Sequence, residues 1–365
     1  MGNYLNPGNI GFEEIRNSQY VDKSGLIALI NDTIGTKQKL TCISRPRRFG
    51  KSFAAQMLCA YYDKTCDSSA LFEDLEISTN EKLSRTYKQH LNRYDVIYLD
   101  MTAVIGAAHA VSAAGNKFIM VIDEWDDPIR EAGDQPIVQK EYLEFLRSLF
   151  KNSGMTAKVF AAAYMTGILP IKKDASQSAI SDFEEFTMVK PRKFGTYVGF
   201  TEDEVRKLCT DYNQDFAKMK QWYDGYSFRG VDSVYNPNSV MKAIRNDDFD
   251  SYWTQTSAAE SLMGYISLDF DGLSRTVTEL LGGVPVKVDT SAFANDLVTF
   301  RNRDDALTVL IHLGYLAYDE KTECVRIPNE EIRMEFTKTI REVKRDETIR
   351  RVRESDQLIQ VIEKF

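Results

Sequence analysis

Three short stretches of this 365-residue chain carry side chains that could bind and cleave a phosphate group. The first reads R-P-R-R-F-G-K-S over residues 45–52 and ends like the pattern G-x-x-x-x-G-K-[ST]. In that pattern backbone N–H groups surround the phosphates, the lysine reaches the β- and γ-phosphates, and the hydroxyl binds Mg²⁺. Lys51 and Ser52 are the candidates for the last two roles. Arg45 stands where the pattern has its first glycine.

The other two stretches are apolar runs that end in polar side chains. F-I-M-V-I-D-E ends at Asp123 and Glu124, which predicts a carboxylate for the Mg²⁺ site followed by one that orients and deprotonates water. Acids at the end of a strand are also common in ordinary turns. A-A-A-Y-M-T-G contains Thr166, whose hydroxyl could contact the γ-phosphate or simply belong to a strand end.

The elements around these stretches predict that they lie together. Strands are expected at 39–44, 95–102, 117–126, 158–167 and 186–190, and a helix follows the loop from residue 52. Near-continuous apolar strands alternating with helices indicate a parallel sheet covered on both faces. Because ligands bind beyond the carboxyl ends of parallel strands, the loop, both acids and Thr166 should share one edge.

The start of the loop must differ from the common form. Arg45 cannot easily adopt the positive φ that the first glycine often supplies, and Pro46 has no N–H to offer a phosphate. The F-G-K-S half is intact, so phosphate binding is expected to survive. Arg47 and Arg48 could neutralise phosphate charge or pair with acids of this chain. The residues expected to contact the nucleotide are Pro46, Arg47, Arg48, Phe49, Gly50, Lys51, Ser52 and Phe53.

Composition narrows the class of protein. A net charge of -8 argues against a broad electropositive surface for nucleic acid, although a local basic patch remains open. Five cysteines without a C-x-x-C and three widely separated histidines favour neither a disulfide framework nor a metal site of that kind. No apolar run reaches membrane-spanning length and no leader pattern is present, so we expect a cytoplasmic protein without a membrane partner.

After residue 199 the alternation of apolar strands and helices gives way to helical and loop sequence. A capping box at Thr201 and Glu204 marks the start of this part. The expected parts are a helical preface over 1–38, the phosphate-loop core over 39–199, a helical lid-like domain over 200–303, a winged-helix-like unit over 304–338 and a charged helical tail over 339–365.

Features beyond the core leave alternatives open. A winged-helix-like unit could bind nucleic acid or a protein, and fold analogy alone does not decide. The mixed charges of 341–353 fit a solvated helix face better than a nucleic-acid contact. Asp224, in W-Y-D-G-Y-S-F, is either a lid or substrate contact or part of a turn whose aromatic side chains fill the second domain.

Taken together, the motifs resemble the AAA-ATPase-like family of bacterial and archaeal P-loop proteins. The resemblance extends over residues 10–336 and includes R-P-R-R-F-G-K-S, V-I-D-E-W-D, A-A-Y-M-T-G-I-L-P-I, Y-V-D-K-S, W-Y-D-G-Y and L-I-H-L-G-Y-L-A-Y. In this family arginine is usual at the first position of the loop. The resemblance implies an α/β P-loop NTPase fold of the additional-strand type with sheet order 5-1-4-3-2. It also implies nucleotide binding at Lys51, Ser52, Asp123 and Glu124.

Two departures from the family pattern stand out. Residues 103–116 bridge the second and third strands with about the minimum length for a parallel crossover, and relatives have a longer segment there. Many relatives also carry a C-terminal PD-(D/E)XK-type nuclease domain, whereas residues 337–365 show no strand with that set of acids. Nuclease activity is therefore not expected.

The function expected from the sequence is binding of ATP with Mg²⁺ and its slow hydrolysis. Lys51, Glu124 and Thr166 are the expected catalytic residues, and Ser52 and Asp123 the metal ligands. The alternatives are a nucleotide-regulated module that contacts DNA or a protein with little turnover, and a shortened relative without function. The base preference, the oligomeric state and any arginine finger are left open.

Overall fold

The computed structural model describes residues 5–101, 117–131, 135–150, 159–171, 182–228, 230–253, 270–291, 293, 302–338 and 340–341. The elements of its first half are α1 (Ile10–Arg16), α2 (Gly25–Asn31), β1 (Leu40–Ser44), α3 (Lys51–Tyr62), α4 (Ser69–Phe72), α5 (Glu76–Thr79), η1 (Ser84–Thr86), α6 (Tyr87–His90), β2 (Asp95–Asp100), β3 (Phe118–Asp123), α7 (Asp127–Glu131), α8 (Pro136–Phe150), β4 (Phe160–Gly167) and β5 (Glu184–Phe186). Those of the second half are η2 (Arg192–Phe194), β6 (Phe200–Thr201), α10 (Glu202–Asp211), α11 (Phe216–Tyr223), β7 (Tyr226–Phe228), β8 (Val231–Tyr235), α12 (Pro237–Asn246), η3 (Phe270–Gly272), α14 (Leu273–Leu281), β9 (Val286–Lys287), α15 (Arg303–Leu313), β10 (Ala317–Asp319) and β11 (Cys324–Arg326).

A five-stranded sheet forms the core of the first half. Its strand order is β2-β3-β4-β1-β5, and each pair of neighbours runs parallel. This is the expected order 5-1-4-3-2 read from the other edge, so the prediction of an additional-strand P-loop sheet is confirmed. Every residue of β1, β3 and β4 is buried, as expected for strands covered on both faces.

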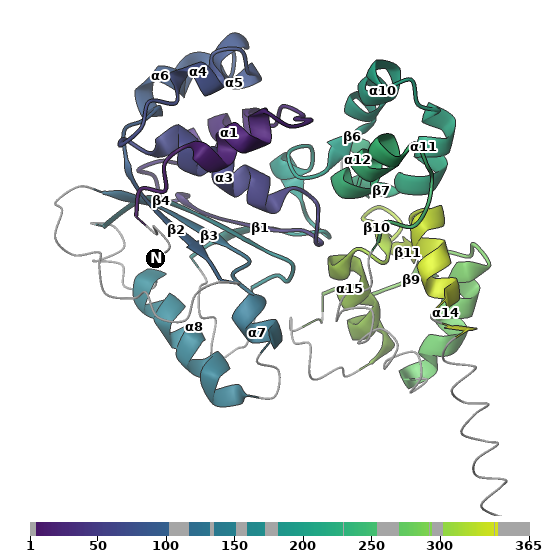
Figure 1. Cartoon of the computed structure of the whole chain (residues 1–365). Helices are drawn as coiled ribbons and strands as arrows, with labels where there is room; N and C mark the ends of the chain where they lie inside the picture. Colours follow the sequence, from purple (N-terminus) through teal and green to yellow (C-terminus); the bar gives the residue numbers. More distant parts are fainter. Residues whose placement is uncertain are drawn as a thin grey trace, which may run out of the picture.

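Helices cover the two faces of this sheet (Figure 1). On one face α1 and α3 pack in the larger apolar cluster, which includes Phe12 and Leu58. On the other face α8 contributes Leu146 and Phe150 to a second cluster. The layered arrangement leaves the carboxyl edge of the strands free for the polar residues that follow them.

One strand expectation needs correction. A strand was expected at 186–190, but β5 ends at Phe186, and residues 187–190 form a turn in which the Thr187 N–H donates to the Lys190 carbonyl over 3.2 Å. Met188 is nevertheless buried in that turn. The apolar pattern therefore reflected burial of side chains rather than strand pairing.

The segment after the core begins with a small antiparallel sheet of order β6-β8-β7, covered by α10, α11 and α12. The expected capping box is present, because Thr201 and Glu204 satisfy each other's backbone N–H groups at the start of α10. The Glu204 carboxylate also accepts a hydrogen bond from Lys23 over 2.6 Å. This ion pair ties the N-terminal segment to the second half of the molecule.

A winged-helix-like unit follows. It contains α14 and α15 and an antiparallel sheet of order β10-β11-β9. Strand β9 lies before residue 304 and pairs with β11; the domain boundaries all stay predictions. Among the described residues, no helix is long and apolar enough to cross a membrane.

Candidate functional site

The phosphate loop leaves β1 without a turn at Arg45. The Arg45 N–H donates to the Gly167 carbonyl over 2.9 Å, which prolongs the pairing of β1 with β4 by one residue. Positive φ values occur later, at Arg48 (69°) and Gly50 (88°), immediately before α3 begins. The turn is thus shifted towards the lysine, and replacement of the first glycine by arginine requires no left-handed backbone at that position.

The side chain of Arg45 is fully buried and serves as a structural anchor. Its guanidinium donates to the carbonyls of Ser44 (2.9 Å), Phe186 (3.1 Å) and Phe194 (3.4 Å) and lies 5.2 Å from the centre of the Phe228 ring. Burial lowers its pKa to about 10, which still leaves it charged at neutral pH. Arg45 therefore fixes the start of the loop to β5 and to the segment that follows it.

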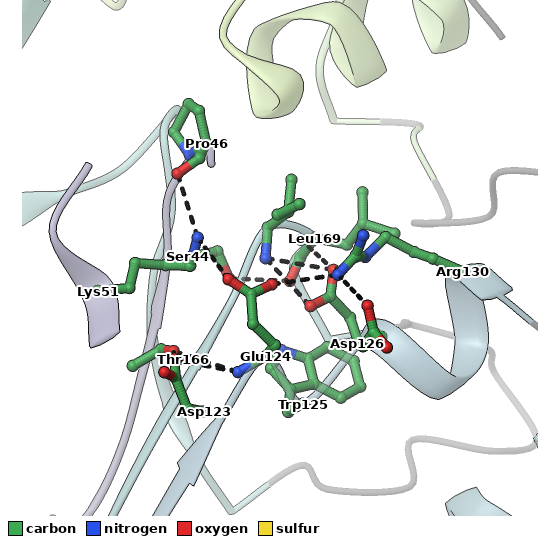
Figure 2. A network of polar contacts seen from close by, with 12 residues as sticks. Ser44, Pro46, Lys51, Asp123, Glu124, Trp125, Asp126, Arg130, Thr166 and Leu169 are labelled. Carbon is green, nitrogen blue, oxygen red and sulfur yellow. Dashed lines mark hydrogen bonds and ion pairs between the residues drawn. The ribbon is translucent and has the colours of Figure 1, made fainter. Parts of the chain in front are cut away.

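Lys51 meets the acid pair at the carboxyl edge of the sheet (Figure 2). Its Nζ lies 2.9 Å from Glu124 Oε1 and donates to the carbonyls of Arg45 (3.2 Å) and Pro46 (3.1 Å). The lysine is 3% exposed. The loop and the acid-bearing strand are thus brought together as the sequence predicted.

Asp123 is a buried carboxylate that accepts hydrogen bonds from the Glu124 N–H (3.2 Å) and from hydroxyl groups. Thr166 Oγ1 donates to Asp123 Oδ1, and Ser52 also donates to this carboxylate. Burial raises the pKa of Asp123, against the effect of these two hydrogen bonds and of the Lys51 charge. A carboxylate that burial penalises in this way is a favourable ligand for a divalent cation, which supplies the missing charge.

Glu124 occupies the left-handed region with φ at 51°, which is uncommon for a residue other than glycine. Its carboxylate lies between two cations, Lys51 and Arg130, the latter at 3.1 Å. Although burial acts to raise its pKa, the charges of Lys51, Arg130 and Arg47 hold the pKa of Glu124 below its usual value. Glu124 is therefore a carboxylate at neutral pH, as a proton acceptor must be.

Asp126 and Arg130 support the acid pair from behind. Asp126 is fully buried and accepts the backbone N–H groups of Ile168 (3.2 Å) and Leu169 (2.9 Å), just beyond Thr166 on β4. Arg130, on α7, lies 3.0 Å from Asp126 while it contacts Glu124 (Figure 2). These contacts lock the turn after β3 to the end of β4.

The donor set fits a magnesium-bound phosphate. Ser52 and Asp123 supply a hydroxyl and a carboxylate that already contact each other, and oxygen ligands of this kind suit Mg²⁺. Gly50 combines a positive φ with open space where a Cβ would stand, so the backbone there is accessible to a ligand. The loop also opens directly into the N-terminus of α3, which favours an anion.

Besides Arg45, three residues of the loop touch the second half of the molecule. A Cβ on Gly314, the residue after α15, would lie 2.8 Å from Pro46 Cγ, so the Pro46 ring lies against the backbone of Gly314. The Phe49 ring packs edge-on against Tyr226 with 5.3 Å between centres. Arg48 donates to the Tyr252 carbonyl over 3.1 Å. The loop is therefore in contact both with the sheet and with the winged-helix-like unit.

A pocket of about 360 Å³ adjoins the loop. Of the eight residues expected to contact a nucleotide, six line it: Arg48, Phe49, Gly50, Lys51, Ser52 and Phe53. Pro46 and Arg47 are not part of the lining. Glu124 also borders the pocket, whereas Thr166 is turned to Asp123, so its contact with a γ-phosphate stays a prediction.

Other sequence candidates lie away from this pocket or outside the described residues. The Asp224 carboxylate accepts the Gly225 N–H (2.6 Å) and the Ser233 hydroxyl (2.9 Å), in agreement with the turn alternative. The crossover 103–116 and residues 342–353 of the charged run lie outside the described residues. Within the described part of the chain, no group of three or more acidic, histidine or cysteine side chains is placed to hold a metal by itself.

Sequence reasoning missed three parts of the site. Arg130 and Asp126 were not among the expected residues, although their i, i+4 spacing next to Asp123 and Glu124 was a usable signal. The far wall of the pocket, on α12, could not be predicted, because nothing in the sequence connects residues 237–245 with the loop.

Comparison with known proteins gives one family and two individual similarities. A family described as "AAA-ATPase_like: Predicted AAA-ATPase" matches residues 8–110 and 105–176, in two pieces that overlap in the short crossover. A protein of Azotobacter chroococcum mcd 1, described as "Uncharacterized protein in vnfD 5'region", is 23% identical over 282 residues. That alignment covers 68% of this chain and 52% of the relative, so the chain spans about half of that relative's length.

Among solved structures, the crystal structure of Cdc6p from Pyrobaculum aerophilum is similar over 90% of this chain and 98% of its own. The two are 11% identical, and the TM-score is 0.29. A TM-score of this size does not establish a shared fold. The fold assignment depends instead on the order and direction of the five strands.

Proposed function

Residues 8–176 match the model of the AAA-ATPase-like family, and from this premise we propose that the protein binds ATP with Mg²⁺ and hydrolyses it slowly. The observation that carries the proposal is the meeting of the loop lysine and the acid pair. Lys51 Nζ lies 2.9 Å from Glu124, and Ser52 contacts Asp123, all at the carboxyl edge of one parallel sheet. Such an edge is where nucleotides bind in sheets of this type.

The proposed roles follow from the contacts. Ser52 and Asp123 would hold Mg²⁺, which would neutralise charge on the β- and γ-phosphates. Thr166 holds Asp123 in place, and Lys51 is available to the phosphates once it leaves Glu124. A triphosphate competes with the Glu124 carboxylate for the lysine, so binding should separate the pair.

Glu124 is the proposed proton acceptor. When Lys51 turns to the phosphates, Glu124 keeps its contact with Arg130, which fixes the carboxylate. The carboxylate can then orient a water molecule and accept its proton during attack on the γ-phosphate. The charge of Arg130 keeps Glu124 ionised but makes it a weak base, which fits slow turnover.

The alternative function, a nucleic-acid contact through the winged-helix-like unit, has less support. In α15 the residues from Asp305 to His312 are all buried, so this stretch offers no exposed face to a groove in DNA. A nucleotide-regulated module that contacts a protein remains the second candidate, because the loop touches this unit directly.

Phosphate release and ATP binding of wild type and Glu124→Gln test the proposal. Wild type is expected to bind ATP with Mg²⁺ and release phosphate. Glu124→Gln should retain binding and lose at least about 100-fold of the turnover, since the amide cannot accept the proton. Glu81→Gln, an exposed position away from the site, is the matched control and should behave like wild type.

The outcomes separate the alternatives. Binding without turnover in wild type contradicts hydrolysis and favours the nucleotide-regulated module. Absence of binding in a folded sample contradicts the whole proposal. Equal turnover in wild type and Glu124→Gln removes the assignment of Glu124 and leaves binding intact.

A further inference from the structure

One face of helix α12, in the second half of the molecule, lines the pocket beside the loop. Asn238, Met241, Lys242 and Arg245 line the pocket, and their spacing of three and four residues places them on one side of α12. Figure 1 shows α12 among the elements of the second half, apart from the core sheet. The pocket therefore joins the phosphate loop to a domain that carries none of the predicted site residues.

The opposite wall comes from the N-terminal segment. Gln19, Tyr20, Val21 and Lys23 line the pocket there. Arg245 Nε donates to Gln19 Oε1 over 3.0 Å, so the two walls already touch. Lys23 is held by Glu204 and by the Thr196 carbonyl (2.7 Å), which fixes this wall to the second half. The pocket is thus built by contacts across three distant parts of the chain.

The chemistry of the lining differs from one part to another. Towards the loop it offers Gly50, Lys51 and Ser52, which suit phosphate. The rest is largely apolar, with Val21, Met57 and Met241 among its members. An apolar pocket of about 360 Å³ with a few polar groups is of the size and kind that holds a flat heterocycle.

Asn238 supplies the polar group that could recognise such a ring. Its Nδ2 is buried and has no hydrogen-bond partner among the described residues. A buried amide without a partner costs free energy, which a ligand would recover by accepting its hydrogen bond. An asparagine amide offers a donor beside an acceptor, and this pair matches the N6 and N7 edge of adenine.

We propose that this pocket holds the base and ribose of the nucleotide, with Asn238 selecting adenine. The inference rests on the proposed function and extends it, since it names the group that reads the base. A bound nucleotide then bridges the loop and α12. Lys242 and Arg245, on the same face of α12, also line the pocket.

The test compares ATP with tripolyphosphate, which lacks base and ribose, by isothermal titration in the presence of Mg²⁺. Wild type should bind ATP at least about tenfold more tightly than tripolyphosphate. Met241→Trp fills the pocket and should remove that advantage while tripolyphosphate affinity stays within about twofold. Val284→Trp, at an exposed position, is the matched control and should keep the advantage.

Asn238→Ala gives a second test, which does not depend on filling the pocket. It should reduce the preference for ATP over GTP by about tenfold, with tripolyphosphate binding unchanged. Retained tripolyphosphate binding shows in each variant that the loop is folded. Equal affinities of wild type for ATP and tripolyphosphate overturn this inference alone, as do unchanged ATP affinities in both variants. Failure of wild type to bind either ligand overturns the proposed function as well.

Discussion

Arg45 and Lys51 are two buried cations at opposite ends of one phosphate loop, and they are held in different ways. Arg45 donates to three backbone carbonyls and packs near a phenylalanine ring. Lys51 faces a carboxylate that can release it, beside a pocket. The difference indicates that the start of the loop is a structural anchor, whereas its end is free to exchange one anion for another.

The largest expected effect is on stability, at the anchored end. Arg45→Met keeps much of the volume but removes the guanidinium that donates to the carbonyls of Ser44, Phe186 and Phe194. We expect the free energy of unfolding to fall by about 4 kcal/mol, measured by urea denaturation. Arg93→Met, at an exposed arginine, is the matched control. A loss below about 1 kcal/mol would contradict the role of Arg45 as an anchor.

The opposite pattern is expected at Lys51. Lys51→Met should weaken ATP binding by about 100-fold, because the phosphates lose their cation. The free energy of unfolding should change by only about 1 kcal/mol, since Glu124 keeps Arg130. Isothermal titration and urea denaturation measure the two effects, with exposed Lys82→Met as control. If Lys51→Met lost stability but kept ATP binding, the comparison between the two ends would be reversed.

The free energy of unfolding should depend on pH through Glu331, which lies where the phosphate loop meets the second half of the molecule. The Glu331 carboxylate accepts a hydrogen bond from the Tyr252 N–H over 2.8 Å, and the Tyr252 carbonyl accepts one from the Arg48 guanidinium. Burial raises the pKa of Glu331 to about 7, despite the hydrogen bond from the backbone at Tyr252, with a smaller contribution from Glu335. Because the folded pKa lies above the unfolded one, the contribution to stability is full below pH 4.5 and is lost as pH rises through 7.

We therefore expect wild type to lose about 2 kcal/mol of unfolding free energy between pH 5 and pH 8 relative to Glu331→Gln. The glutamine is neutral at both values and keeps an acceptor for Tyr252. Urea denaturation of both proteins at the two pH values measures the difference. Identical pH dependence in the two proteins would remove Glu331 from this account.

The smallest effect is expected at Arg48, which is exposed and makes one hydrogen bond to the Tyr252 carbonyl. Arg48→Ala should cost about 0.5–1 kcal/mol of unfolding free energy. ATP binding should weaken by about fivefold or less, because Lys51 and Ser52 stay in place. A loss of binding as large as that of Lys51→Met would show that Arg48 belongs to the phosphate-binding end of the loop instead.

The sequence was sufficient for those features that depend on local pattern. The buried strands β1, β3 and β4 follow from their apolar runs, and the meeting of Lys51 with Glu124 follows from the shared edge of a parallel sheet. Arg45 was identified as incompatible with the usual turn. Where its guanidinium would find partners could not be predicted, because Phe186 and Phe194 lie about 140 residues further along the chain.

Features that depend on tertiary contact escaped the sequence. The T-M-V run after Phe186 contains Met188, which is buried in a turn. The spacing of apolar residues alone does not distinguish such a turn from a strand. Asn238 lies in the first turn of α12, and only the folded chain places it beside the loop. The proposed contact with a base therefore could not be inferred from motifs, whereas the proposed contacts with phosphate could.

The most direct test of the central claim is the effect of Mg²⁺ on ATP affinity in wild type and Asp123→Asn. If the loop and the acid pair share one magnesium triphosphate, Mg²⁺ should tighten ATP binding by about tenfold or more in wild type and have little effect in the variant. An equal tightening by Mg²⁺ in both proteins would contradict the claim that Asp123 and Lys51 serve the same ligand.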